Sequence, residues 1–234
     1  MRASKFKLAN RRRVRLLDVG CGGGTLLGLL QHQGLDVLGF DTAPEAADIA
    51  KTQSGVDIAT GARLHDSEFA DASFDMVSLF HVMEHVPDPR NLLAEVRRIL
   101  CHGGKVVLQV PNIESWQSRI CGTRWHGLDV PRHVINYSTE SVQRLLVDFG
   151  FRIVRVRHFN LRDNAPAFAS SLFPALDPGR RRVRQSRGNT GELSLLTWAK
   201  HALYLAAVAA VLPFAIAESL AGCGATLMVE AEKV

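Results

Sequence analysis

Short apolar runs alternate with helical patterns along the first two-thirds of the chain. The apolar runs have the length of buried strands and lie at 14–19, 35–40, 56–60, 74–81 and 105–110. Segments with helical spacing stand between several of them, at 25–33, 44–51 and 89–100. Strands that helices regularly separate indicate crossover units and a parallel sheet covered on both faces. The pattern therefore predicts the α/β class.

The last hundred residues begin with the same kind of pattern and then depart from it. Ser138 is a favourable N-cap for a helix that reaches Phe149, and Gly150 stops it. Residues 151–159 alternate apolar and basic side chains, as a half-exposed edge strand does. Residues 225–231 are strand-like as well. The segment between these two strands has a different composition.

That segment, residues 161–223, combines basic and apolar stretches. A run of sixteen uncharged residues, 202–217, is shorter than the roughly 20 that span a bilayer, and Pro213 interrupts it. Three alternatives remain open: a lid packed on the domain or on a second subunit, a monotopic segment on anionic lipid, or a transmembrane helix. An arginine cluster beside Gly and Pro indicates an exposed loop before this run, at Arg180, Arg181, Arg182, Arg184 and Arg187.

Composition narrows the class of protein. The chain has 234 residues, of which 47% are hydrophobic and 22% charged, and this excludes a disordered chain. Four scattered cysteines without a CxxC pair indicate free thiols in a reducing compartment. The net charge is +5, but the arginines lack interleaved aromatic residues, so we expect no nucleic-acid partner. The basic N-terminus precedes no long apolar stretch, and we expect a cytoplasmic protein.

A glycine-rich turn follows the first strand. Gly20, Gly22 and Gly24 let a tight turn join strand to helix, so that a ligand can approach the backbone and the helix N-terminus. Asp41 ends the second strand, where a carboxylate can accept both hydroxyls of a ribose. The pattern predicts an adenosine-like ligand across the carboxyl ends of the strands.

Two residues distinguish a dinucleotide from S-adenosylmethionine as the expected ligand. A dinucleotide fingerprint favours glycine at the position of Thr25. The carboxylate of Asp18 would not help to bind a negatively charged pyrophosphate. It suits a cationic ligand such as an ammonium or a sulfonium. The sequence therefore favours S-adenosylmethionine.

Together these motifs resemble those of class I S-adenosylmethionine-dependent methyltransferases, in particular the group that includes ubiquinone-pathway O-methyltransferases. The matching segments are residues 16–24, 38–41, 73–77, 81–89 and 103–105. The resemblance implies a Rossmann-like, seven-stranded mixed sheet in the order 3-2-1-4-5-7-6, closed by a hairpin of residues 151–159 and 225–231. It also implies three parts: a basic arm (1–13), a methyltransferase domain (14–160 plus 224–234) and a helical insertion before the last strand (161–223).

The resemblance assigns cofactor contacts residue by residue. The methionine moiety would lie against the turn, Asp41 would hold the ribose, and the backbone of Leu64 would meet the adenine. Arg63 stands where the family commonly has an acid. The full set of expected contacts is Asp18, Gly20, Cys21, Gly22, Asp41, Thr42, Leu64, Phe80 and His81.

The reaction itself needs few catalytic groups. Methyl transfer is an in-line displacement, so alignment and exclusion of water supply much of the catalysis. A hydroxyl acceptor also benefits from a base, for which histidine is suited near neutral pH. His133 is our first candidate for that base and His81 the second. We expect no metal, because the i, i+4 pair of His81 and His85 has no cluster of carboxylate ligands beside it. The Glu84–His85 pair is expected to organise the loop after the fourth strand.

Residues 111–133 resemble a block common in one branch of these methyltransferases. Their mixed polar and aromatic pattern predicts a loop over the active-site mouth. Trp125 could wall the acceptor, Arg132 could hold an anionic group, and His133 could take the proton. The alternative is that Arg132 and His133 only anchor the loop.

We therefore expect methyl transfer from S-adenosylmethionine, giving S-adenosylhomocysteine, to a small-molecule acceptor. The favoured acceptor is the hydroxyl of a lipophilic or phenolic, quinone-like compound. The alternatives are O-methylation of a sugar or polyketide-like metabolite, N-methylation, or a catalytically inactive, cofactor-binding regulatory protein. Residues 193–222 would mediate a homodimer or a peripheral contact with the inner face of the membrane.

Overall fold

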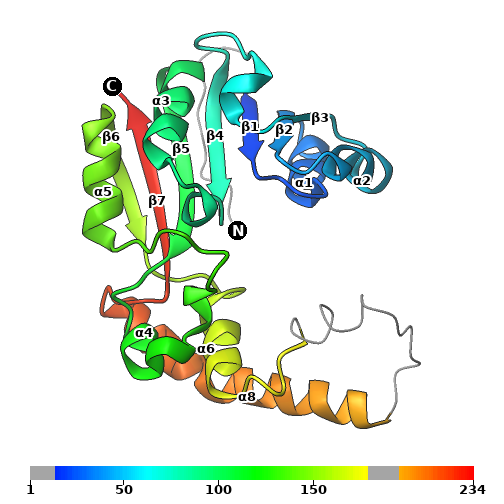
Figure 1. Cartoon of the computed structure of the whole chain (residues 1–234), viewed down its shortest axis with the longest axis vertical. Helices are drawn as coiled ribbons and strands as arrows, with labels where there is room; N and C mark the ends of the chain where they lie inside the picture. The colour runs from blue at the N-terminus through cyan, green and yellow to red at the C-terminus, as the bar shows by residue number, and fades with distance from the viewer. Residues whose placement is uncertain (1–13, 179–194) are drawn as a thin grey trace.

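Seven strands form one mixed sheet in the order β3-β2-β1-β4-β5-β7-β6, in the computed structural model that describes residues 14–178 and 195–234 (Figure 1). The predicted class and strand order are confirmed. The neighbours among β1 to β5 are parallel, and β7 is antiparallel to both β5 and β6. The strands are β1 (Arg15–Val19), β2 (Asp36–Asp41), β3 (Ile58–Thr60), β4 (Phe74–Phe80), β5 (Leu100–Pro111), β6 (Phe151–Arg157) and β7 (Thr226–Lys233).

Helices cover the sheet because both of its faces are apolar. Successive residues of a strand point to opposite faces. Leu17 accordingly packs in the large core with the helices at Pro89–Ile99 and Thr139–Asp148, while Leu16 packs in a smaller core with those at Thr25–His32 and Glu45–Ser54. The helices of the described residues are α1 (Thr25–His32), α2 (Glu45–Ser54), α3 (Pro89–Ile99), α4 (Trp116–Cys121), α5 (Thr139–Asp148), α6 (Asn164–Leu172) and α8 (Leu195–Leu220).

Local signals set several of these boundaries. Ser138 caps α5 as predicted, because its side chain accepts a hydrogen bond from the backbone amide of Ser141 at 3.1 Å. The segment 111–133 differs from the predicted loop, since it contains α4 and two short 3-10 turns. Ser115 accounts for α4, accepting a hydrogen bond from the amide of Ser118. β5 begins at Leu100, five residues before the predicted start, with an irregular register opposite β4.

α6 and α8 lie between β6 and β7 in the chain, and α8 extends beyond the sheet along the bottom of Figure 1. Its residues Thr197–Leu220 are long and apolar enough to cross a membrane by length and composition, and 11% of the most apolar window is buried. The C-terminal end of α8 nevertheless packs on the body, where Glu218 is fully buried. The predicted basic arm and arginine loop fall at 1–13 and within 179–194, outside the described residues.

Candidate active site

The glycine turn after β1 brings the backbone close to the segment after β4. Gly20 has φ +73°, and a Cβ there would lie 2.5 Å from Cγ2 of Val82. Gly22 has φ +51° with open space beside it. Side chains rarely adopt this left-handed backbone, so the turn requires glycine for its conformation at both positions and for close packing at Gly20.

Two carboxylates flank this turn. Asp41 accepts hydrogen bonds from the backbone amides of Gly22 at 2.8 Å and Ala43 at 2.9 Å. Asp18 is buried in β1 and accepts a hydrogen bond from the hydroxyl of Ser78 at 2.6 Å. Burial raises the pKa of Asp18 to about 6, although the Ser78 hydrogen bond opposes the shift. Asp18 is therefore mainly ionised at pH 7.

Cys21 lies near enough to both carboxylates to feel their charge. Burial, with the negative charges of Asp18 and Asp41 adding to it, raises the pKa of the Cys21 thiol to about 12. The side chain therefore stays a neutral thiol at physiological pH, which excludes a thiolate nucleophile here.

A cavity of about 640 Å³, the first cavity, opens at the carboxyl ends of β1, β2 and β4. Several of the residues predicted for the cofactor line it together: Gly20, Asp41, Thr42, Leu64 and His81. Arg63 also lines it, and its guanidinium pairs with Asp66 at 3.2 Å. The other predicted contacts, Asp18, Cys21, Gly22 and Phe80, are not among the lining residues.

A second cavity of about 1050 Å³ lies beside the segment 123–133, α6 and α8. The three residues predicted for the acceptor, Trp125, Arg132 and His133, all line it. His81 lines both cavities. The two cavities therefore meet at His81, between the residues predicted to bind a donor and those predicted to bind an acceptor.

A polar network holds His81, whose backbone has φ +56°. Its Nδ1 lies 3.2 Å from Oε1 of Glu84, and its Nε2 lies 3.3 Å from Oδ2 of Asp163. The side-chain amide of Gln109 lies 2.7 Å from both Nε2 of His81 and Oδ2 of Asp163. Burial opposes protonation, but the hydrogen bonds to Asp163 and Glu84 outweigh it and raise the pKa of His81 to about 9. His81 therefore holds its second proton at pH 7.

A backbone carbonyl, rather than carboxylates as at His81, holds the ring of His133. Its Nδ1 lies 2.8 Å from the carbonyl oxygen of Gly127, which can only accept, so Nδ1 carries a proton in that bond. In the neutral ring, Nε2 is then left with a lone pair. His133 is largely buried, with 10% of its side chain exposed, and its ring lies 4.7 Å from that of His85, centroid to centroid.

The other two predicted acceptor residues differ in exposure. Trp125 is 3% exposed and packs with Cys121 and Phe168, so much of its ring belongs to a small core beneath the second cavity. Arg132 is exposed and pairs with Asp129 at 2.7 Å. Arg132 keeps a free approach to an anionic group from solvent, whereas Trp125 mainly shapes the cavity wall.

Comparison with known proteins identifies the family. The sequence model of a methyltransferase domain family matches residues 2–156, about two-thirds of the chain. The chain belongs to this methyltransferase family. The predicted family resemblance is confirmed.

Relatives of this methyltransferase include two proteins named ubiquinone biosynthesis O-methyltransferase. That of Erwinia tasmaniensis is 33% identical over 126 residues, covering 50% of this chain and 51% of the relative. That of Cereibacter sphaeroides is 37% identical over 118 residues, covering 48% of each. The chain thus spans about half the length of these relatives.

A solved structure shares the whole architecture. The S-adenosylmethionine-dependent methyltransferase of Archaeoglobus fulgidus superposes with a TM-score of 0.60 at 18% identity, covering 94% of this chain and 86% of the other. This likeness shows the class I methyltransferase fold.

The sequence interpretation of this methyltransferase missed the partners of His81. Asp163 lies in the segment that composition set apart from the domain, so no motif pointed to it. Gln109 could have been predicted as a site residue, because it is a polar residue near the carboxyl end of an otherwise apolar strand. Polar residues at that end of a parallel sheet are positioned for ligands.

Proposed function

We propose that this methyltransferase transfers a methyl group from S-adenosylmethionine to the hydroxyl of a phenolic, quinone-like small molecule. The observation that carries the proposal is the meeting of the two cavities at His81. Gly20 and Asp41 line one cavity, and His133 lines the other. The two relatives named ubiquinone biosynthesis O-methyltransferase support a hydroxyl acceptor of the quinone type.

The first cavity suits the donor. It holds a carboxylate at the end of β2 for a ribose, and its volume of about 640 Å³ is in the range of small-molecule sites. Asp18, ionised above its pKa, supplies negative charge for the ammonium of a methionine moiety. The proposed donor contacts remain Asp18, Gly20, Cys21, Gly22, Asp41, Thr42, Leu64, Phe80 and His81.

S-adenosylmethionine supplies a methyl group already activated by its sulfonium. The acceptor oxygen attacks the methyl carbon, the carbon–sulfur bond breaks, and S-adenosylhomocysteine leaves. His133 takes the hydroxyl proton at Nε2, since its Nδ1 proton is committed to Gly127. His81, whose two ring nitrogens are engaged by Glu84 and Asp163, forms the wall that the donor and acceptor cavities share.

Described residues of the segment 161–223 complete the second cavity. Asp163 and Pro166, near and within α6, and Tyr204 of α8 line it. We propose that residues 14–160 and 224–234 form the methyltransferase domain and that 161–223 are an insertion that closes the acceptor site. This arrangement would make the insertion a determinant of acceptor choice.

We further propose that α8 places the second cavity at a membrane surface on the cytoplasmic side. Apolar side chains of α8 are exposed, among them Trp198 at 59% and Leu205 at 66%. Because Tyr204 of the same helix lines the second cavity, a lipophilic acceptor could pass from the lipid into the site. A homodimer through α8 is the alternative that a vesicle experiment would distinguish.

The test is an acceptor panel with labelled donor. We expect methylated product from catechols and hydroxylated quinone precursors, detected by mass spectrometry, and none from sugars or amines. Methylation of sugars or amines alone would assign another acceptor class. Calorimetric binding of the donor without product from any acceptor would indicate the cofactor-binding regulatory protein.

A further inference from the structure

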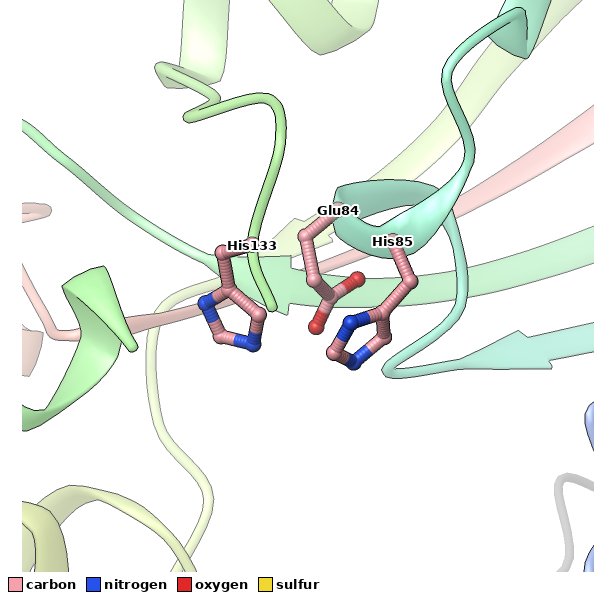
Figure 2. A group of neighbouring side chains, drawn as sticks. All are labelled: Glu84, His85 and His133. Carbon is pink, nitrogen blue, oxygen red and sulfur yellow. The ribbon is translucent and has the colours of Figure 1, made fainter. Parts of the chain in front are cut away.

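Three side chains that could ligate a metal converge between the two cavities. Glu84, His85 and His133 each place one donor atom within 4.8 Å of the others (Figure 2). Glu84 and His85 follow β4, whereas His133 comes from the segment after α4. The backbone joins these segments, because the amide of Val134 donates to the carbonyl of Glu84 at 2.8 Å. The cluster is therefore built into the fold.

Glu84 is a buried acid, and one of its two carboxylate oxygens makes no hydrogen bond to the described residues. It is 1% exposed, and its Oε1 lies 3.2 Å from Nδ1 of His81. Its Oε2 is buried and has no hydrogen-bond partner among the residues that the structure describes. A buried carboxylate oxygen without a partner is costly, so such a position calls for a ligand. A cation would satisfy it.

Both histidines are oriented as metal ligands commonly are. Nδ1 of His85 donates to the carbonyl of Arg132 at 2.9 Å, and Nδ1 of His133 donates to that of Gly127 at 2.8 Å. Such bonds to backbone carbonyls fix the ring and the tautomer of metal-bound histidines. In both neutral rings the lone pair is then on Nε2. Nε2 of His133 points towards Glu84, whereas Nε2 of His85 has to turn towards them for an ion to bind (Figure 2).

We propose that Glu84, His85 and His133 bind one divalent transition-metal ion, such as Zn²⁺. Two histidines and one carboxylate form a ligand set of catalytic zinc and of mononuclear iron sites, and both leave positions open for a substrate. Metal–ligand bonds of about 2.0–2.2 Å draw the three donor atoms closer together than they now lie. The side chain of His85 is exposed, so its ring can turn, and the exposed residue Arg132, whose carbonyl holds Nδ1, can follow it.

The position of the cluster suggests its role, and this part rests on the proposed function. His85 lines the first cavity and His133 lines the second. An ion held there would lower the pKa of a phenolic hydroxyl that enters the second cavity, and the proton would pass to water. His133 then acts as a ligand rather than as the base. This proposal differs from the expectation of no metal. That expectation rested on the pair of His81 and His85, because the sequence gives no sign that His133 lies beside His85.

The test measures metal binding by the full-length protein without donor or acceptor. Protein freed of metal by a chelator is titrated with Co²⁺, followed by visible absorption, and with Zn²⁺, followed by calorimetry. We expect one ion per chain. Glu84→Gln, His85→Ala and His133→Ala should each weaken binding at least about tenfold, the lower end of what a lost partner of a metal-bound histidine costs. His126→Ala, an exposed histidine that lines the second cavity, is the matched control.

Thermal unfolding shows whether each variant is folded and whether Zn²⁺ stabilises it. Zn²⁺ should raise the Tm of the wild type and of His126→Ala but not that of His85→Ala, whose exposed side chain can be removed without opening the core. No binding by the wild type, or equal loss in His126→Ala, would overturn the proposal. Metal binding with no methylation of any phenol would leave the site standing and reject the proposed function alone.

Discussion

Asp41 accepts a hydrogen bond from the backbone amide of Gly22 at 2.8 Å and so ties the end of β2 to the turn after β1. Its second oxygen is oriented by the amide of Ala43. A ribose would therefore meet a carboxylate whose position is already fixed, which lowers the cost of ordering on binding.

Asp41→Asn tests this arrangement. Both carboxylate oxygens of Asp41 accept hydrogen bonds, whereas an asparagine side chain has only one acceptor oxygen. We therefore expect donor affinity to fall about 10-fold or more, as for a lost hydrogen bond to a charged group. Calorimetry with S-adenosylhomocysteine measures the change. Asp57→Asn, an exposed carboxylate paired with Lys51, is the control. Equal affinity of Asp41→Asn and the wild type would reject the ribose assignment.

Asp18 predicts a pH dependence of donor binding. Its pKa of about 6 means that acidification from pH 7.5 to 5 protonates it and removes the charge that attracts an ammonium. Donor affinity should therefore fall with pH in the wild type, while Asp18→Asn should bind weakly at both values. A wild-type affinity that does not change between pH 7.5 and 5 would contradict the role of Asp18.

The contribution of Asp18 to stability runs in the opposite direction. Because burial raises its pKa, the folded state holds this proton more firmly than the unfolded chain does. The free energy of unfolding should therefore decrease as pH rises from about 4 through 6. Urea unfolding of wild type and Asp18→Asn isolates this contribution, and it should be smaller in the variant.

His133→Ala should reduce turnover about 10²- to 10⁴-fold, in the range of a lost proton acceptor, and leave donor affinity intact. The reason is that His133 lines the second cavity and not the first. Steady-state kinetics and calorimetry measure the two effects, with His102→Ala, an exposed histidine that lines neither cavity, as the matched control. Near-normal turnover would show that His133 neither takes the proton nor holds a metal for the reaction.

Glu218 predicts a second stability effect. It is fully buried against Gln117, and burial raises its pKa to about 7. Ionisation as pH rises through 7 should therefore lower the free energy of unfolding, by about 3 kcal/mol at most. Glu218→Gln should be more stable than the wild type at pH 8.5 and lose this slope, in urea unfolding at several pH values. A slope that persists in Glu218→Gln, or that Glu140→Gln removes equally, would refute the assignment.

Leu205 tests the membrane proposal. Leu205→Glu adds a charge to the exposed part of α8 and should weaken flotation with anionic vesicles several-fold, because it opposes burial in the lipid interface. Leu29→Glu changes an equally exposed leucine of α1 and should have no effect. Equal flotation of both variants would exclude α8 as the contact, and a loss of dimer in Leu205→Glu would support a subunit interface.

The sequence was sufficient for the sheet because its strands are short apolar runs and its turn needs glycine. It was insufficient where residues far apart in the chain meet. Nothing local indicates that Asp163 reaches His81 or that His133 reaches Glu84, since loops and an insertion set those contacts. The uncharged run 202–217 is the middle of α8, which begins at Leu195 and ends at Leu220. Burial against Gln117 accommodates the acid Glu218 in the last turn.

Transfer of a labelled methyl group to a phenol is the decisive measurement for the proposed reaction. Purified protein is incubated with S-adenosylmethionine labelled in its methyl group and a catechol or hydroxylated quinone precursor, and the product is analysed by mass spectrometry. We expect one labelled methyl on a phenolic oxygen, together with an equal amount of S-adenosylhomocysteine, and much less of both with Asp41→Asn. Unlabelled acceptor after full donor binding, or label on nitrogen or carbon, would contradict the proposed reaction.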